Sequence, residues 1–518
     1  MKTILQVLSS LLQGLHAQRK YSARFLVVGF VLIGVAIAVL LPPFRSPDES
    51  THWRLAITRL DKILHPYRAC VPFGDLGVPF LFDPYVGRPP HDRFTSLSKQ
   101  PPDCSPHPKM YGGTLTYPGA VVSLLLFTNQ NSDRAEFIRA YFIGRLLQGL
   151  LVALVMWRVA TLMLEKQTAG TLVVLGFPLV ALAVQESFSV TADGVVIAFA
   201  LMLCAAMTSL DRFRARDVAL FAFFGYCSSI SKPFITPVIL PALFAGFVFM
   251  RKSSQPHGLA SIIREFLQLF VPRRRPSRLH VLVWVGCILC VLSAMATFAD
   301  FGSLPMKVDS AAQRAFVLAN PRVFFFNLPA SVLRLVDNLD VFNGPLGVLD
   351  ATVSPETVTH FRHLLYALVL VELMLLIPRF LPALGATSGG SGEIASPLRR
   401  RWLPILAACL LVLGGIATAF YGVIASLYLT WTTRGQLFLQ GFQSRYAIPH
   451  VLLLLALFAA GFSATFPPRD QYQADSNEAA APARIATGVA QVAVAAILLA
   501  TALLFLGGLY FDLQKRYF

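Results

Sequence analysis

Charged residues are scarce in this chain, and their scarcity excludes a soluble globular protein. Only 14% of the 518 residues are charged, whereas 55% are hydrophobic and the mean hydropathy is +0.62. A soluble domain needs a larger share of polar residues to cover its core. We therefore expect an all-α, polytopic integral membrane protein.

Acidic residues are the scarcer of the two charged kinds, with 27 Asp and Glu against 44 Lys and Arg. A net charge of +17 occurs in proteins that bind nucleic acid, but here the basic residues fall largely in short connections between hydrophobic stretches. Basic residues in such connections set the orientation of a membrane protein. We expect membrane lipids, and no nucleic acid, as partners.

Cysteine is also sparse, with seven residues in all. Two of them, Cys70 and Cys104, follow the first hydrophobic stretch and would form a disulfide only in an oxidising compartment, so both states stay open. The other five lie within hydrophobic stretches, where a free cysteine behaves as a small apolar side chain. These five are Cys204, Cys227, Cys287, Cys290 and Cys409.

Eleven hydrophobic stretches are long enough to be candidates for crossing a bilayer. They are residues 25–41, 139–163, 169–187, 191–210, 216–231, 233–250, 280–299, 361–382, 402–426, 444–464 and 485–508. A further stretch, Leu115–Phe127, is short and contains Pro118 near its start. We expect it to form a re-entrant or interfacial helix, and a twelfth crossing is the alternative.

Basic residues in the short connections place the N-terminus in the cytoplasm. Two long loops, 43–138 and 300–360, then face the extracytoplasmic side, where most of the unusual polar residues gather. The first crossing is expected to be a retained anchor, because no small-residue cleavage site precedes its end. The expected parts are a cytoplasmic N-terminus (1–24), a transmembrane domain (25–465), a cytoplasmic linker (466–484) and a final crossing with a tail (485–518).

Two acids and a histidine stand where the first hydrophobic stretch meets water. Asp48, Glu49 and His52 follow a pair of prolines that ends the preceding helix. Acidic groups at a fixed depth in a membrane protein suit acid–base chemistry, and we predict these three as catalytic residues. The alternative is that the acids cap and begin a helix over Glu49–Lys62.

Four ionisable residues lie near the predicted outer ends of crossings. Charged side chains are energetically costly there, which makes them candidates for a functional role. Arg145, Lys232 and Arg445 are predicted to bind a lipid phosphate, for which arginine's fixed fork is especially suited. For Lys232 the alternative is that its side chain reaches the headgroups. Asp193 is predicted either to hold a sugar hydroxyl or to cap the helix that follows it.

The sequence lacks the motifs of two other enzyme classes, the metalloproteases and the serine hydrolases. Glu49 and His52 have the spacing of half a zinc-protease motif, but its leading histidine is replaced by Asp48, which disfavours a metalloprotease. A serine hydrolase is disfavoured because no Gly-x-Ser-x-Gly sequence occurs. Glu356 and His360 could join the first-loop acids in a divalent metal site, although we predict neither a metal nor another cofactor.

Six motifs occur in a fixed order along residues 25–465. They are Pro42-Pro43 with Pro47-Asp48-Glu49 and His52, then Gly144-Arg145-Leu146, Ser189-x-x-Ala192-Asp193-Gly194, Ser231-Lys232-Pro233, Gly344-Pro345-Leu346-Gly347-Val348-Leu349-Asp350, and Gly441-Phe442-Gln443-Ser444-Arg445-Tyr446 with Pro449. In this order they resemble an uncharacterised bacterial family of polytopic membrane proteins, a domain of unknown function. One departure is Ser444, where the family usually has glycine before Arg-Tyr.

That family is similar to the GT-C class of membrane glycosyltransferases, which take sugars from polyprenyl-phosphate donors. The resemblance implies a bacterial inner-membrane enzyme whose active face is extracytoplasmic, with inversion at the sugar and Asp48 as the acid of the first loop. It also places Gln443, Tyr446 and Asp350 in the substrate site. The acceptor would be a cell-envelope glycan or lipid.

The sequence thus favours a membrane glycosyltransferase that uses a polyprenyl-phosphate sugar. Asp48 would be the general base, and Glu49 and His52 would position the acceptor or support Asp48. The departing phosphate would be neutralised by Lys232, Arg445 and Arg145. Two alternatives stay open. The same basic residues would serve a transporter or flippase of lipid-linked saccharides, and the chain could be a non-catalytic partner in envelope polysaccharide assembly.

Overall fold

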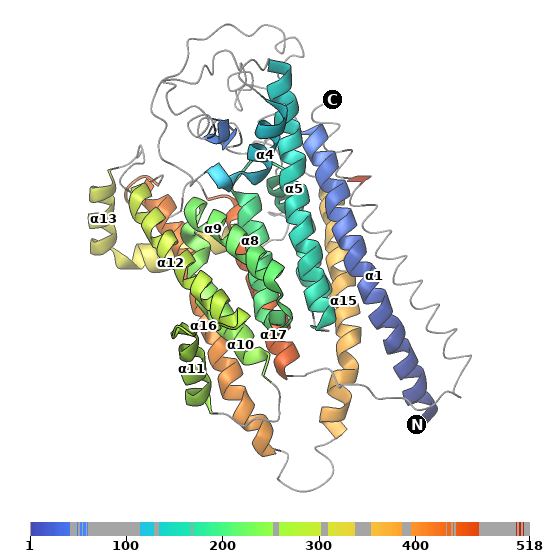
Figure 1. Ribbon diagram of the computed structural model, residues 1–518. Coiled ribbons are helices and arrows are strands. Elements are labelled where there is room, and N and C mark those ends of the chain that lie inside the picture. Colours follow the sequence, from blue (N-terminus) through green and yellow to red (C-terminus); the bar gives the residue numbers. More distant parts are fainter. Residues whose placement is uncertain are drawn as a thin grey trace.

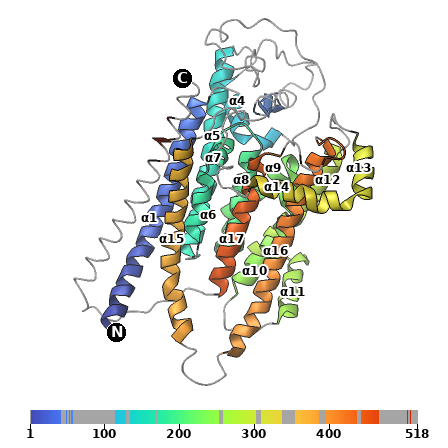
Figure 2. The same ribbon diagram turned by 180° about the vertical axis from the view of Figure 1, so that it is seen from behind.

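In the part of the chain that it describes, the computed structural model consists of helices joined by turns and short irregular segments, with no strand, which confirms the all-α prediction. Figures 1 and 2 show long helices running side by side, with shorter helical pieces gathered toward one end. The structure describes residues 2–41, 114–128, 134–166, 170–251 and 258–301, then 309–336, 354–385, 395–430 and 442–465, together with residue 168 and single residues within 49–60, 432–439 and 504–511. Asp48, Asp350, Cys70, Cys104 and the predicted linker 466–484 lie outside this part.

Six helical segments in the described residues are long and apolar enough to cross a membrane. They are Lys20–Leu40, Arg139–Glu165, Asp193–Arg212, Arg278–Ala296, Leu403–Leu429 and Ser444–Ala464. They match six of the eleven predicted crossings, so the chain has the helices of a membrane protein. The other five predicted crossings, and with them the total of eleven or twelve, are not confirmed.

The prediction of one continuous helix crossing at 169–187 is wrong, because the segment is divided into three helical pieces. These are α6 (Thr171–Gly176), the 3₁₀-helix η3 (Phe177–Leu179) and α7 (Ala181–Ser187). Pro178 cannot donate a helical hydrogen bond, and Val180 leaves the helical conformation with ψ 134°. The break turns α7 so that its end can contribute to the site.

Prolines also shorten the helices that follow. α9 (Ala215–Ser231) ends before Lys232, the 3₁₀-helix η5 (Pro233–Val238) carries prolines at 233 and 237, and α10 (Ile239–Phe249) completes the predicted crossing 233–250. None of these pieces reaches the length of the six long segments. Lys232 therefore lies at a break between two helices, as its position between a serine and a proline suggested.

The other helices complete the bundle. In chain order they are α1 (Lys2–Leu40), η2 (Thr114–Thr116), α4 (Pro118–Phe127), α5 (Arg134–Glu165), α8 (Asp193–Ser209), η4 (Leu210–Arg212), α11 (Leu259–Leu267), η6 (Gln268–Phe270), α12 (Arg278–Phe301), α13 (Ser310–Ala319), η7 (Val323–Asn327), α14 (Leu328–Val336), α15 (Pro355–Gly385), α16 (Ala395–Thr430), η9 (Ser444–Tyr446) and α17 (Ile448–Thr465). α1 passes without interruption through the predicted boundary at residue 24. α4 confirms a short helix within the stretch 115–127.

Helix α8 forms the centre of the bundle, because every one of its residues is buried. It packs against α5, α9, α10 and α17. Its contact with α10 is close, since a side chain at Gly246 would overlap the carbonyl of Ala206. Cys204 lies on this helix as a free thiol, and the other four cysteines of the hydrophobic stretches are also free, as predicted. The end of α8 that begins with Asp193 carries the polar residues described below.

The turn between α7 and α8 is held in place by Phe188. Its fully buried ring fits between Gly34 of α1 and Gly149 of α5, where a Cβ atom at either glycine would overlap it. Phe30 packs against the same ring, with centroids 5.6 Å apart. Two glycines on separate helices thus fix the position of the chain just before Asp193.

We expect Gly149→Leu to destabilise the protein by about 1–3 kcal/mol, because the added side chain would displace the Phe188 ring from a packed core. Thermal unfolding in detergent micelles measures this change. Gly414→Leu is the matched control, since Gly414 lies in the long helix α16 with no atom near its Cβ position. Equal unfolding temperatures for the two variants would contradict the packing role of Phe188.

Candidate functional site

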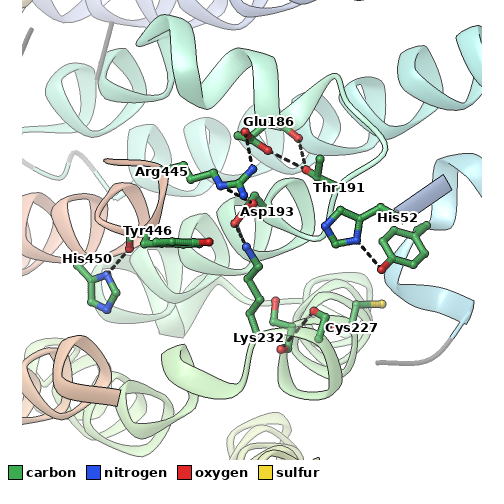
Figure 3. Close-up of polar contacts among 12 residues, drawn as sticks. His52, Glu186, Thr191, Asp193, Cys227, Lys232, Arg445, Tyr446 and His450 are labelled. Carbon is green, nitrogen blue, oxygen red and sulfur yellow. Dashed lines mark hydrogen bonds and ion pairs between the residues drawn. The ribbon is translucent and has the colours of Figure 1, made fainter. Parts of the chain in front are cut away.

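Three buried charged side chains and one partly buried lysine meet where α8 begins (Figure 3). Lys232 Nζ lies 2.5 Å from Asp193 Oδ1, and Arg445 Nη1 lies 3.1 Å from Glu186 Oε1. Arg445 Nε also lies 3.5 Å from Asp193 Oδ2, which joins the two pairs. We call Glu186, Asp193, Lys232 and Arg445 the ionic cluster. They come from the end of α7, the start of α8, the break after α9 and η9.

The ionic cluster is balanced in charge and largely shielded from solvent. Glu186 is fully buried, and the side chain of Arg445 is 2% exposed. Thr191 donates a hydrogen bond of 3.0 Å from its hydroxyl to Glu186 Oε2. Buried ions persist when they are paired and hydrogen-bonded in this way. The side chain of Lys232, at 11% exposed, is the most open member, which makes it the first that a ligand would meet.

An aromatic ring lies against both cations. The Tyr446 ring centroid is 4.8 Å from Lys232 Nζ and 5.4 Å from the Arg445 guanidinium carbon, distances typical of cation–π contacts. Phe442 packs edge-on against the same ring. Gln443, which precedes η9, has a buried amide oxygen with no hydrogen bond among the described residues. The predicted residues Gln443 and Tyr446 therefore adjoin the cluster through the η9 segment.

A second buried ion pair lies beside the cluster. Arg145 Nε and Nη2 donate to the two oxygens of Glu49 at 2.9 and 2.6 Å, and both side chains are fully buried. Glu49 also accepts the backbone N–H of Val190 at 2.9 Å. Arg145 Nη1 donates to the carbonyls of Ala38 and Leu41 at the end of α1. One guanidinium thus joins α1, α5 and the helical residues after 48.

This pair changes the interpretation of Arg145 and Glu49. The sequence predicted Arg145 as a phosphate ligand and Glu49 as a catalytic acid, but the structure directs each toward the other in a site closed to solvent. Val190, whose amide binds Glu49, lies three residues before Asp193. The geometry is therefore that of a positioning pair, which anchors the chain next to Asp48.

His52 lies across the ionic cluster from Tyr446 (Figure 3). It is helical and buried, and its Nδ1 is 2.7 Å from the hydroxyl of Tyr117. The described residues between 49 and 60 are helical, in agreement with the helix predicted over Glu49–Lys62. Lys232 contacts the Asp193 carboxylate directly, and the His52 imidazole lies near the same cluster.

The structure brings together most, but not all, of the predicted site residues. Asp193, Lys232, Arg445 and Tyr446 meet in and around the cluster, with His52 beside them. Glu186 was missed by the sequence analysis, because it ends an apolar run that was interpreted as a crossing. A carboxylate at the end of such a run is itself a signal, since ionisable residues there are rare. Asp48 and Asp350 lie outside the described residues.

Glu356 and His360 both lie in the first turns of α15, as their spacing suggested. Within the part of the chain that the structure describes, no three His, Cys, Asp or Glu side chains are close enough to hold a metal ion. Comparison of the chain with protein families, curated proteins and solved structures gives no match.

Proposed function

We propose that this protein is a membrane glycosyltransferase that transfers a sugar from a polyprenyl-phosphate donor to a cell-envelope glycan or lipid. The reaction would take place at the extracytoplasmic face of a bacterial inner membrane. The observation that carries the proposal is the convergence of separate sequence motifs. Asp193, Lys232 and Arg445 come from segments far apart in the chain, yet they meet in one ionic cluster, and His52 lies beside it.

The two cations of the cluster suit the leaving group. When the anomeric carbon–oxygen bond breaks, the bond electrons go to the lipid phosphate, whose negative charge must be stabilised. Preorganised donors in a site closed to water provide the largest part of such stabilisation. Asp193 and Glu186 fix Lys232 and Arg445 before the substrate arrives, and Lys232 uses one of its three N–H donors on Asp193.

The acceptor hydroxyl must lose a proton as its oxygen attacks the anomeric carbon. We assign this proton to the Asp48 carboxylate, whose neighbour Glu49 is anchored by Arg145 and by the Val190 amide. His52, held by Tyr117, would bind the acceptor or orient it. Glu49 and Arg145 would act on the reaction only by position.

We expect Asp48→Asn to lower turnover on the order of 10²–10⁴-fold, because the amide keeps the carboxylate's shape but cannot accept the proton. The measurement is acceptor-dependent loss of a panel of polyprenyl-phosphate sugars by the purified protein in nanodiscs. Binding of the same donors is measured in parallel. Unchanged donor binding would separate a chemical defect from a folding defect.

Glu356→Gln is the matched control, since it makes the same change from carboxylate to amide at an exposed residue in the first turn of α15, outside the cluster. Equal turnover by Asp48→Asn and Glu356→Gln would remove Asp48 from the mechanism. Donor binding by the parent protein without turnover, together with movement of the donor across vesicle membranes, would overturn the enzyme proposal in favour of a flippase.

A further inference from the structure

Helix α11 lies at the end of the bundle away from α13 (Figures 1 and 2). One face of this short helix is packed against the protein. Phe266 is buried and contacts the rings of Phe244 and Phe247 on α10, with centroids 5.1 and 5.7 Å away. The aromatic contacts fix the helix, so its remaining faces have fixed directions.

A second apolar stripe begins on the same helix and is exposed. Ile263 and Leu267 lie four residues apart on one face of α11, and Val271 follows directly after η6. They are 41%, 56% and 56% exposed. An apolar stripe beside polar residues on a membrane protein is typical of a helix that lies in the bilayer interface.

The chain around α11 is strongly basic. Residues 251–278 contain seven cationic side chains and one acid, Glu265, which forms an ion pair with Arg251. Five of the arginines are exposed in the structure, and one of them, Arg278, donates a hydrogen bond to the carbonyl of Phe213. The other four, which can reach a headgroup layer, are Arg264, Arg273, Arg274 and Arg275.

A tryptophan marks the depth of this region. The Trp284 side chain on α12 is 43% exposed, and its indole N–H donates to the carbonyl of Leu269 at 3.2 Å. Half-exposed tryptophan with a satisfied N–H is enriched where a membrane meets water. The apolar stripe, the exposed arginines and Trp284 thus lie along one short stretch of chain at the boundary expected for lipid headgroups.

We infer that residues 259–278 form a docking surface for anionic phospholipid headgroups. The acyl chains would cover Ile263, Leu267 and Val271, while the phosphate groups would contact Arg264 and the arginines at 273–275. Juxtamembrane cations attract an anionic leaflet, and each further cation strengthens the attraction. This inference does not depend on the proposed enzymatic function.

The test is to replace Arg273, Arg274 and Arg275 together with glutamine in the full-length protein. Native mass spectrometry of detergent-solubilised protein titrated with phosphatidylglycerol or with phosphatidylcholine measures the lipids that remain bound. We expect the affinity for phosphatidylglycerol to fall tenfold or more, and retention of phosphatidylcholine to stay unchanged. Added salt should weaken the phosphatidylglycerol complex of the parent protein.

The matched control is the triple variant R314Q/R322Q/R434Q, which loses the same charge from exposed positions distant in sequence from α11. An equal loss of phosphatidylglycerol in both triple variants would overturn the surface, because net charge alone would explain it. So would unchanged binding in the first variant. A second experiment tests the same surface without changing an arginine. It measures the quenching of Trp284 fluorescence by brominated phosphatidylglycerol, as the difference between the parent protein and W284F. Absence of quenching would contradict the proposed surface.

Discussion

Arg445→Met is expected to abolish measurable turnover and to destabilise the protein by about 3–5 kcal/mol. The substitution keeps much of the side-chain length but leaves the Glu186 carboxylate, fully buried in the parent protein, without its guanidinium. Removing one partner of a buried pair leaves an uncompensated charge, and that is the source of the large effect. Thermal unfolding in micelles and the nanodisc turnover assay measure the two losses.

The double variant with Glu186→Gln and Arg445→Met separates the loss of stability from the loss of turnover. Removing both charges leaves no unpaired ion, so we expect much of the stability to return. Turnover should not return, because the cation that faces the leaving phosphate is still missing. A double variant as unstable as Arg445→Met would refute the ion-pair explanation. Full turnover by the single variant would exclude Arg445 from the proposed reaction.

Arg145→Met is expected to have a stability effect of similar size, about 3–5 kcal/mol. It would break two hydrogen bonds to Glu49 and two to carbonyls at the end of α1. Arg145→Lys should restore only part of the loss, since an ammonium cannot reproduce the two-pronged contact. Unfolding by graded addition of a denaturing detergent to micelles measures each variant.

Lys166→Met is the matched control for this prediction. Lys166 Nζ lies 2.6 Å from Asp211 Oδ2, the same distance as in the Glu49–Arg145 pair, but both side chains are about one-third exposed. Exposed pairs contribute about 0–1 kcal/mol. Similar losses for Lys166→Met and Arg145→Met would show that burial does not set the strength of the Glu49–Arg145 contact.

The sequence predicted the basic members of the site because a charge near an apolar stretch is conspicuous. Lys232 stands between Ser231 and Pro233, and Arg445 stands before a long apolar run. Their partners were harder to predict, since Arg445 pairs with a residue 259 positions earlier and Arg145 with one 96 positions earlier. Nothing in local periodicity encodes such a pairing. Glu49 was therefore interpreted from its own neighbours as a catalytic acid, although its carboxylate is directed to Arg145.

Hydropathy predicted helices well but helix continuity poorly. It averages over a window, so the stretch 169–187 scored as one crossing although Pro178 interrupts it. The same averaging hid Glu186, because a single carboxylate hardly lowers the mean of an apolar run. Side-chain size carried further information that a hydropathy scale ignores. The fit of Phe188 between Gly34 and Gly149 depends on missing Cβ atoms, and only the packed helices reveal it.

The long sequence separation within the ionic cluster has a consequence for biosynthesis. A ribosome delivers Glu186, Asp193 and Lys232 to the membrane well before Arg445, so these three enter with an excess of negative charge. Arg445 arrives with η9, directly ahead of α17, which packs against α8. The ionic cluster therefore becomes neutral only when α17 packs against α8. This late step of assembly both completes the site and removes its unpaired negative charge.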